Sequence, residues 1–284
     1  MSATINTNVN SLTAQRNSSA SQASLATSMQ RLSSGLRINS AKDDAAGLGI
    51  AERMTSQVKG MNVAIRNAND GVSMAQTAEG ALSKVSDMLQ RMRELAVQGS
   101  NATNNSSDKD SLGQEYAQLS KEIDRVIKGT TFNGKAILAG GAGATTTFQV
   151  GAGTTANDTI AVNFTDMSSN ATMGNVTTTG TANAINSAST TGSLGTVIQN
   201  LDDALDKVNS ERAVLGATQS RFDAVVSTLQ VSSENQSAAR SRIMDADFAA
   251  ETASLSRAQV LQQAGNAMVA QANQLPQSVL KLLQ

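Results

Sequence analysis

Several residue types are missing, or nearly missing, from this chain of 284 residues. It contains no Cys, no His and no Trp, and only one Pro, one Tyr and five Phe. Without Cys and His the chain lacks the usual zinc ligands, thiol nucleophiles, Ser-His-Asp relays and imidazole acids and bases. Most hydrolytic and redox mechanisms are thereby excluded, so we expect a protein that is not an enzyme and has no metal or cofactor.

Charge and aromatic content argue against nucleic acid and membranes as partners. The 22 basic and 23 acidic side chains are scattered and give a net charge of −1 without a basic stripe. So few aromatic rings offer no stacking platform for bases, and we expect no nucleic acid partner. No run of 18 apolar residues occurs, which predicts no membrane insertion. The first 15 residues have neither a basic region nor an apolar run, so we expect no secretory signal peptide.

Apolar residues at seven-residue spacing are the strongest pattern in the chain. Hydrophobic residues make up 39% of it and are mostly small and aliphatic, which favours slender helix-on-helix seams. One row predicts a long helix over about 44–99. Its members are Met61, Ala68, Ala75, Leu82, Leu89 and Ala96. A shorter helix ending at Gly129 is expected next, with Ser107 as its N-cap.

Two further rows predict long helices in the second half of the chain. The first row is Leu194, Leu201, Val208, Leu215, Phe222 and Leu229. The second row is Leu261, Met268, Leu275 and Leu282. Pro276 interrupts the second row and is expected to bend its helix locally.

The first 40 residues carry a weaker version of the same pattern. Their apolar face consists of Leu25, Met29, Leu32 and Leu36. Ser18 lies seven positions before Leu25, where an apolar residue would be expected. Segments so rich in Ser, Asn, Thr and Gln bury little surface to offset the entropy of ordering, so the terminal helices are expected to be marginal in isolation.

The middle of the chain has a different character. Residues 130–166 alternate like short strands, and Asn133-Gly134 is a turn dipeptide between two of them. Residues 167–201 carry no charge and are mainly Ser, Thr, Asn, Gly and Ala, a composition that predicts a surface loop. The sequence therefore predicts a mainly α protein. We expect a long antiparallel helical bundle or coiled-coil rod built from both chain termini, with a small β-hairpin region at its central tip.

Three motif-like features are better explained by structure than by chemistry. The acidic pairs 43–44 and 202–203 have no third ligand nearby, and acidic residues at helix starts are common. Gly47-Leu48-Gly49 is not a dinucleotide-binding fingerprint, because Glu52 occupies the third glycine position and no strand precedes it. These features leave the expectation of no metal and no cofactor unchanged.

Two longer runs are far more specific. Residues 31–47 read RLSSGLRINSAKDDAAG, and residues 256–265 read SRAQVLQQAG, followed by QANQLPQSVLKLL over 271–283. Both closely resemble the terminal signatures of bacterial flagellin. The runs INTNV at 5–9, RMRELAVQ at 91–98, FNG at 132–134, QVG at 149–151 and SRIMDAD at 241–247 match as well. The resemblance covers about 1–166 and 194–284.

The resemblance implies a filament protein with a layered arrangement. Residues 1–43 and 240–284 would form the inner domain that lines the filament channel. Residues 44–166 and 194–239 would form the next shell of helices with a β-hairpin. Residues 167–193 would be a reduced variable surface loop that replaces the larger outer domains of other family members.

The resemblance also implies a set of partners. The chain would polymerise with itself into the extracellular flagellar filament after export through the flagellar type III apparatus. Its terminal helices would fold as each subunit joins the growing tip. An export chaperone, the filament cap and the hook-associated proteins would be further partners, and the monomer would be recognised by host Toll-like receptor 5.

Three groups of candidate residues follow from the rows and the resemblance. The expected filament-core contacts are Leu25, Leu32, Leu36, Leu261, Met268, Leu275 and Leu282. The residues that match the family's receptor-facing surface are Arg91, Leu95 and Glu115. Ser18 stands where family members usually place Leu, and we expect it to influence filament shape.

Three alternatives stay open at this point. A hook-filament junction protein shares heptad termini and export, although the C-terminal signature fits flagellin better. A flagellin-like protein with a protease in its outer domain would need metal ligands that a His-free chain lacks. A soluble coiled-coil adhesin would form discrete oligomers rather than long filaments.

Overall fold

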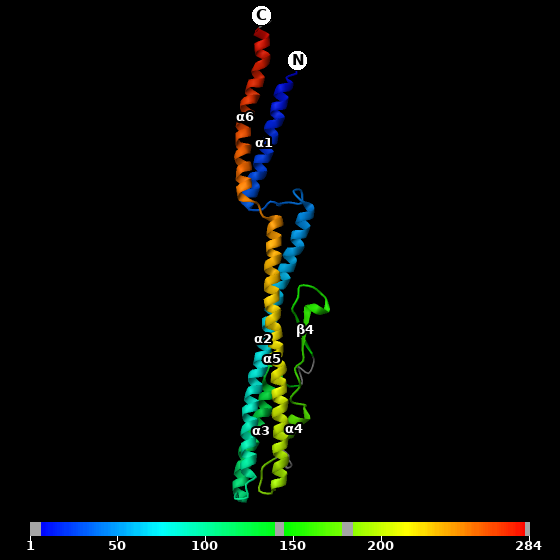
Figure 1. The fold of residues 1–284 in the computed structure, drawn as a ribbon, viewed down its shortest axis with the longest axis vertical. Coiled ribbons are helices and arrows are strands. Elements are labelled where there is room, and N and C mark those ends of the chain that lie inside the picture. The colour runs from blue at the N-terminus through cyan, green and yellow to red at the C-terminus, as the bar shows by residue number, and fades with distance from the viewer. Residues whose placement is uncertain (1–6, 140–144, 178–183, 282–284) are drawn as a thin grey trace. The chain divides into compact units, whose positions relative to one another are not determined.

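The structure is a computed structural model that describes residues 7–139, 145–177 and 184–281, with the side chains described as far as residue 274. Its helices are α1 (Val9–Ser34), α2 (Ala45–Gly99), α3 (Ser106–Gly129), α4 (Ala171–Thr177), α5 (Thr191–Met244) and α6 (Phe248–Lys281). Its strands are β1 (Thr131–Phe132), β2 (Lys135–Ala136), β3 (Thr146–Gln149) and β4 (Thr159–Val162). The predicted mainly α fold with a small hairpin region is confirmed (Figure 1).

The chain divides into two compact units that are described separately. The first consists of residues 1–57 and 234–284, and the second of residues 58–233. Both α2 and α5 therefore contribute to each unit. The assignment of 1–43 with 240–284, and of 44–166 with 194–239, to two filament shells stays a prediction.

The core of the second unit lies where α2, α3 and α5 meet. All six members of the predicted row on α2 are buried. On α5 the row is buried from Leu194 to Phe222, and Leu229 is half-buried. Side-chain contacts show that α2 and α5 run antiparallel, because Gln219 bonds to Glu79 and Arg93 bonds to Asp202 farther along α2.

The predicted hairpins are present in the second unit. The β1–β2 pair has the register Phe132↔Lys135, and its turn residues Asn133 and Gly134 have φ of 48° and 77°. Positive φ at both positions is what a two-residue type I′ turn requires, which is why an Asn-Gly pair stands there. The second pair, β3–β4, is antiparallel with Phe148 opposite Ile160.

The uncharged stretch 167–201 differs from its prediction as a surface loop. Within it the structure shows α4 and the start of α5, and seven of its described apolar side chains are buried. These are Met167, Met173, Val176, Ile185, Leu194, Val197 and Leu201. The Ser120 hydroxyl of α3 donates to the Val176 carbonyl oxygen at 2.9 Å, which ties α4 to α3. Burying this stretch does not require a charged side chain to be removed from water, because it contains none. Its low hydrophobicity was therefore not enough to keep it at the surface.

Helix ends show one further correction. The N-cap of α3 is Asn105 rather than Ser107. Its side chain accepts a hydrogen bond from the Asp108 N–H, and the Asp108 carboxylate accepts one from the Asn105 N–H. This reciprocal capping box satisfies two backbone donors, which a single Ser does not. Pro276 lies within α6, and the bend expected there stays a prediction.

Candidate functional site

The terminal helices α1 and α6 pack against each other along a seam of small residues. The buried positions on α1 are Ser11, Ser18 and Ser28, and those on α6 are Ala258 and Ala272. Gly265 completes a seven-residue spacing on α6, and a β-carbon built on it would lie 3.5 Å from the Ser18 β-carbon. Small side chains let the two backbones approach closely, but they bury little apolar area.

Polar contacts follow the same seam in antiparallel order. The Asn8 side chain donates to the Ala272 carbonyl oxygen at 2.7 Å. The Ser11 hydroxyl donates to Asn273 Oδ1 at 2.8 Å, and the Ser18 hydroxyl is 3.5 Å from Asn266 Oδ1. Seven residues separate both the two Ser and the two Asn, so these contacts share the heptad repeat of the small residues.

Large apolar side chains on both helices point away from this seam. The apolar side chains that are at least half exposed are Val9, Leu12 and Met29 on α1, and Phe248, Val260, Leu261 and Met268 on α6. A groove of about 580 Å³ lies between the helices, with Leu261 and Met268 on its α6 side and Asn10 and Asn17 on its α1 side. None of its lining residues is charged, and no charged residue lies between Arg257 and Lys281.

The predicted filament-core residues occupy two kinds of position. Leu25, Leu32 and Leu36 are half-buried, whereas Leu261 and Met268 are 51% and 63% exposed. The side chain of Leu275 and the whole of Leu282 lie outside the described residues. The row that predicted α6 is therefore not the row that packs on α1. A second row of small residues at 258, 265 and 272 forms the seam, and its heptad spacing was the signal in the sequence.

The receptor candidates of the second unit do not lie together on the surface. Arg91 of α2 and Glu115 of α3 are exposed and paired, with Nε and Oε1 2.9 Å apart. This hydrogen bond to Glu115, joined by one to Glu94, raises the pKa of Arg91. Leu95 is only 1% exposed and belongs to the core. Of these three candidates, only the charged pair is accessible at the surface.

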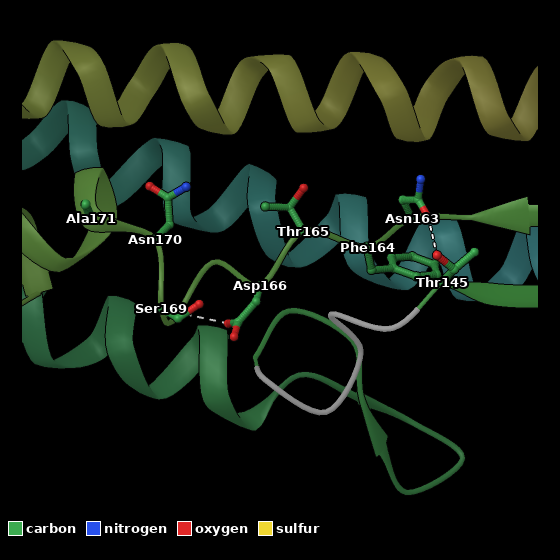
Figure 2. Close-up of a pocket in the computed structure, with 8 residues that line it drawn as sticks. All are labelled: Thr145, Asn163, Phe164, Thr165, Asp166, Ser169, Asn170 and Ala171. Carbon is green, nitrogen blue, oxygen red and sulfur yellow. Dashed lines mark hydrogen bonds between the residues drawn. The ribbon is translucent and has the colours of Figure 1, made fainter.

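A second, polar pocket lies beside β4 in the second unit (Figure 2). It has a volume of about 590 Å³. The Thr145 hydroxyl donates to Asn163 Oδ1 at 2.8 Å, and Asp166 Oδ1 accepts from the Ser168 and Ser169 N–H groups. These polar groups thus bond within the protein, and the Asp166 carboxylate stabilises a turn.

The placement of acidic side chains and the composition of the helices bear on metals and membranes. Across residues 7–139, 145–177 and 184–281, no group of three or more Asp and Glu side chains is placed to hold a metal ion. Over the same part of the chain, no helix has the length and apolar character needed to cross a membrane.

Comparison with known families covers most of the chain. Residues 5–142 match the bacterial flagellin N-terminal helical region, and residues 198–283 match the bacterial flagellin C-terminal helical region. The chain belongs to the flagellin family. As a flagellin it is a structural subunit of the bacterial flagellar filament, which serves motility, and the expectation that it is not an enzyme is confirmed by that family.

Similar flagellins share nearly the full length of this one. It is 41% identical over 279 residues to a flagellin of Halalkalibacterium halodurans, covering 98% of this chain and 99% of the relative. It is 40% identical over 304 residues to the flagellin of Bacillus subtilis, with the same coverage. Flagellin B of Vibrio cholerae is 35% identical over 377 residues, with both chains fully covered. A crystal structure of Bacillus cereus flagellin has a TM-score of 0.48 and 34% identity, covering 58% of this chain and 88% of that one.

Proposed function

We propose that α1 and α6 form the inner contacts of the flagellar filament, where a second copy of this chain covers their exposed apolar side chains and the groove between them. The observation that carries this proposal is the combination of exposed apolar side chains and missing charge on α6. Leu261 and Met268 are both more than half exposed, and 23 residues separate Arg257 from Lys281 without a charge. A surface that stays in water normally carries far more charge, so this one is suited to burial between subunits.

The remaining predicted core contacts extend the same surface. Leu25, Leu32 and Leu36 are half-buried on α1 and its C-terminal end, which leaves part of each side chain for a neighbouring subunit. Leu275 and Leu282 continue the row of Leu261 and Met268 in sequence. Residues 1–43 and 240–284 would thus line the filament channel. Residues 44–166 and 194–239 would form the surrounding shell, and the exposed side chains among residues 167–193 would face outward.

Assembly at the tip is proposed to couple folding to binding. The seam between α1 and α6 buries mainly Ser, Ala and Gly side chains, which contribute little hydrophobic free energy. Helices held so weakly gain most of their stability from neighbouring subunits, so they would order as each subunit is added. The same weakness suits export of an unfolded chain through the flagellar type III apparatus, with an export chaperone before it and the filament cap and hook-associated proteins after it.

Host recognition is the second proposed role. Arg91 and Glu115 form an exposed ion pair across α2 and α3, at the place that matches the family's surface for Toll-like receptor 5. Both charges are accessible in the monomer. Leu95, which is buried, would support this surface from below rather than touch the receptor.

The experiment that tests the inner contacts replaces Leu261 and Met268 together by Gln. This change keeps the helix propensity and removes only apolar surface, whereas the matched control, Leu261→Met with Met268→Leu, keeps that surface. We expect purified control protein to extend filament seeds in negative-stain electron microscopy, and the Gln variant to remain soluble and unpolymerised. Normal filaments from the Gln variant would contradict the proposal.

A further inference from the structure

Two of the sequence runs that resemble flagellin meet at one place in the first unit. The run 31–47 joins α1 to α2, and the run 241–247 joins α5 to α6. Arg37 and Ile243 are 206 positions apart in the sequence and hydrogen-bonded in the structure. Figure 1 shows the two connections passing each other beside the adjoining ends of α1 and α6. We call residues 35–37 and 243–246 together the crossover joint.

The backbones of the crossover joint are tied by two hydrogen bonds. The Arg37 N–H donates to the Met244 carbonyl oxygen at 2.7 Å, and the Ala246 N–H donates to the Gly35 carbonyl oxygen at 2.9 Å. Leu36 and Asp245 face each other between these bonds as an isolated antiparallel bridge. Gly35 permits this path, because its φ of 71° ends α1 in a left-handed conformation that favours glycine.

The side chain of Arg37 closes the end of α5. Its Nε and Nη2 both donate to the Ile243 carbonyl oxygen, at 3.2 and 2.7 Å. Carbonyl groups in the last turn of a helix have no partner inside the helix, and the negative end of the helix dipole lies there. The guanidinium of Arg37 supplies both the hydrogen-bond donors for the carbonyl oxygen and the positive charge that the helix dipole favours. The C-terminal end of α5 is thus capped by the connection that leads out of α1.

The helices that meet at the crossover joint are held by contacts of their own. Asp247 caps the start of α6 by accepting hydrogen bonds from the N–H groups of Ala249 and Ala250. Arg31 near the end of α1 lies 3.8 Å from Glu251 in the first turn of α6. The end of α5 has a local bond from the Asp245 N–H to the Ser241 carbonyl oxygen, but its Ile243 and Met244 carbonyl oxygens accept hydrogen bonds from Arg37.

We propose that Arg37 is a positioning residue that makes the order of the α5 end and the pairing of α1 with α6 depend on each other. The Ile243 and Met244 carbonyl oxygens at the end of α5 receive these hydrogen bonds only when residues 35–37 are in place. The same residues fix where α1 ends relative to the start of α6. Since the α1–α6 seam consists of small side chains, its own packing specifies this alignment weakly, and the crossover joint supplies the missing constraint.

The geometry explains why an arginine suits this position. A planar guanidinium offers several N–H groups in a fixed fork, and here two of them reach one carbonyl oxygen. A lysine places a single ammonium there and would restore the charge but not the fork. We therefore expect Arg37→Lys to recover part of what Arg37→Ala loses.

Hydrogen exchange of backbone amides tests whether Arg37 stabilises the crossover joint, and this measurement does not depend on polymerisation. We expect Arg37→Ala to raise the exchange rate of the Ala246 amide by roughly fivefold to tenfold, the usual value of such a hydrogen bond. The matched control is Arg242→Ala. Arg242 is an exposed neighbour near the same helix end for which no side-chain bond is found, so it removes the same charge without removing the cap. Equal exchange rates at Ala246 in the wild type and Arg37→Ala would overturn the proposal.

Seeded polymerisation tests the consequence, and this second measurement rests on the proposed function. We expect Arg37→Ala to raise the critical concentration for filament growth by about fivefold to tenfold, with Arg37→Lys in between and Arg242→Ala unchanged. A wild-type chain that fails to polymerise would contradict the proposed function and leave the exchange result to decide the role of Arg37. Equal critical concentrations for Arg37→Ala and Arg242→Ala would overturn the role of Arg37 in assembly.

A disulfide rescue separates the tie from other roles of Arg37. Leu36 and Asp245 lie directly opposite each other in the bridge and do not hydrogen-bond to each other through their backbones. In such non-hydrogen-bonded antiparallel pairs the side chains are closely spaced, which suits a disulfide. Because the chain has no Cys, Leu36→Cys with Asp245→Cys adds its only thiols. Because Leu36 is itself a proposed filament contact, the reference is the same oxidised Cys pair with Arg37 present. In an Arg37→Ala background the oxidised pair should restore the critical concentration of that reference, and the reduced pair should not. A higher critical concentration for the oxidised pair with Arg37→Ala than for the oxidised pair with Arg37 present would overturn the proposal.

Discussion

Phe222 of α5 lies directly against the backbone of Gly71 on α2. A β-carbon built on Gly71 would come within 2.7 Å of Phe222 Cζ, and Phe222 is fully buried. The Phe222 ring also contacts Phe148 of β3, and the two rings meet edge-on with their centroids 5.4 Å apart. One glycine in the middle of a long helix thus makes room for the aromatic pair that joins α2, α5 and the β3–β4 hairpin.

We expect Gly71→Ala to destabilise the second unit. The added methyl has to displace a buried ring, and such overpacking costs about 1–3 kcal/mol. The matched control is Gly80→Ala in the same helix, where no atom lies within 4 Å of the added carbon. There the better helix propensity of Ala should stabilise the unit by about 0.5–1 kcal/mol. Urea unfolding followed by circular dichroism measures both changes, and two changes of the same sign would contradict the close packing at Gly71.

Tyr116 provides a prediction about alkaline pH. Burial raises the pKa of Tyr116 from 10.0 to about 12, because the charged phenolate would be desolvated in the core. The folded state therefore holds this proton more tightly than the unfolded state. The contribution of the buried, protonated Tyr116 to the free energy of unfolding is complete below pH 10 and is lost as the pH rises from 10 to about 12. The loss amounts to roughly 2–3 kcal/mol.

The absorbance of tyrosinate near 295 nm measures this shift directly, because Tyr116 is the only Tyr and the chain has no Trp. We expect the folded monomer to titrate near pH 12 and the urea-unfolded chain near pH 10. Tyr116→Phe should remove the corresponding part of the alkaline loss of stability. A folded monomer that titrates near pH 10 would show that Tyr116 is accessible to water.

Ser18 leads to a prediction about filament shape. It is buried in the α1–α6 seam, where its own β-carbon lies only 3.5 Å from a β-carbon built on Gly265. Leu at this position has to move the two helices apart or turn into the neighbouring groove, and the change is repeated in every subunit. We expect Ser18→Leu filaments to differ in supercoil from Ser18 filaments in electron micrographs. Ser18→Ala keeps the size of the side chain and should keep the waveform, and identical waveforms for all three would end the idea.

Arg91 leads to a prediction about host recognition. Arg91→Ala removes one half of the exposed pair with Glu115, and we expect the monomer to activate cells that express Toll-like receptor 5 at least several-fold less. Arg125→Ala is the matched control, since Arg125 also pairs with a carboxylate, that of Glu122, and is exposed. Activation unchanged by Arg91→Ala would remove it from the receptor site. Leu95→Ala is unsuitable as a test because it opens a cavity in the core.

Much of the fold could be predicted from local patterns. The row from Met61 to Ala96 predicted a helix over about 44–99, and the structure has α2 at Ala45–Gly99 with the whole row buried. Asn133-Gly134 predicted a tight hairpin, because few other residue pairs adopt positive φ twice in succession. Such features depend on residues within one or two turns of each other, so the sequence displays them directly.

Burial was harder to predict, because it depends on what covers a residue. Arg91 and Leu95 lie one turn apart on α2, yet the first is exposed and the second is buried against its neighbours. Met173 and Val176 belong to a stretch whose composition predicted a surface loop, but α3 lies beside them. Periodicity identifies the faces of a helix without saying which face meets which partner.

The amino-acid sequence by itself determined that this protein is a mainly helical filament subunit without His or Cys, since residue types, heptad spacing and terminal signatures are all properties of the chain order. Only the tertiary structure decided that the seam of α6 is the small-residue row at 258, 265 and 272 rather than the row of Leu261 and Met268. It alone decided that Arg37 caps a helix 206 positions away. The reason is physical: contacts between distant segments exist only once the backbone has brought them together.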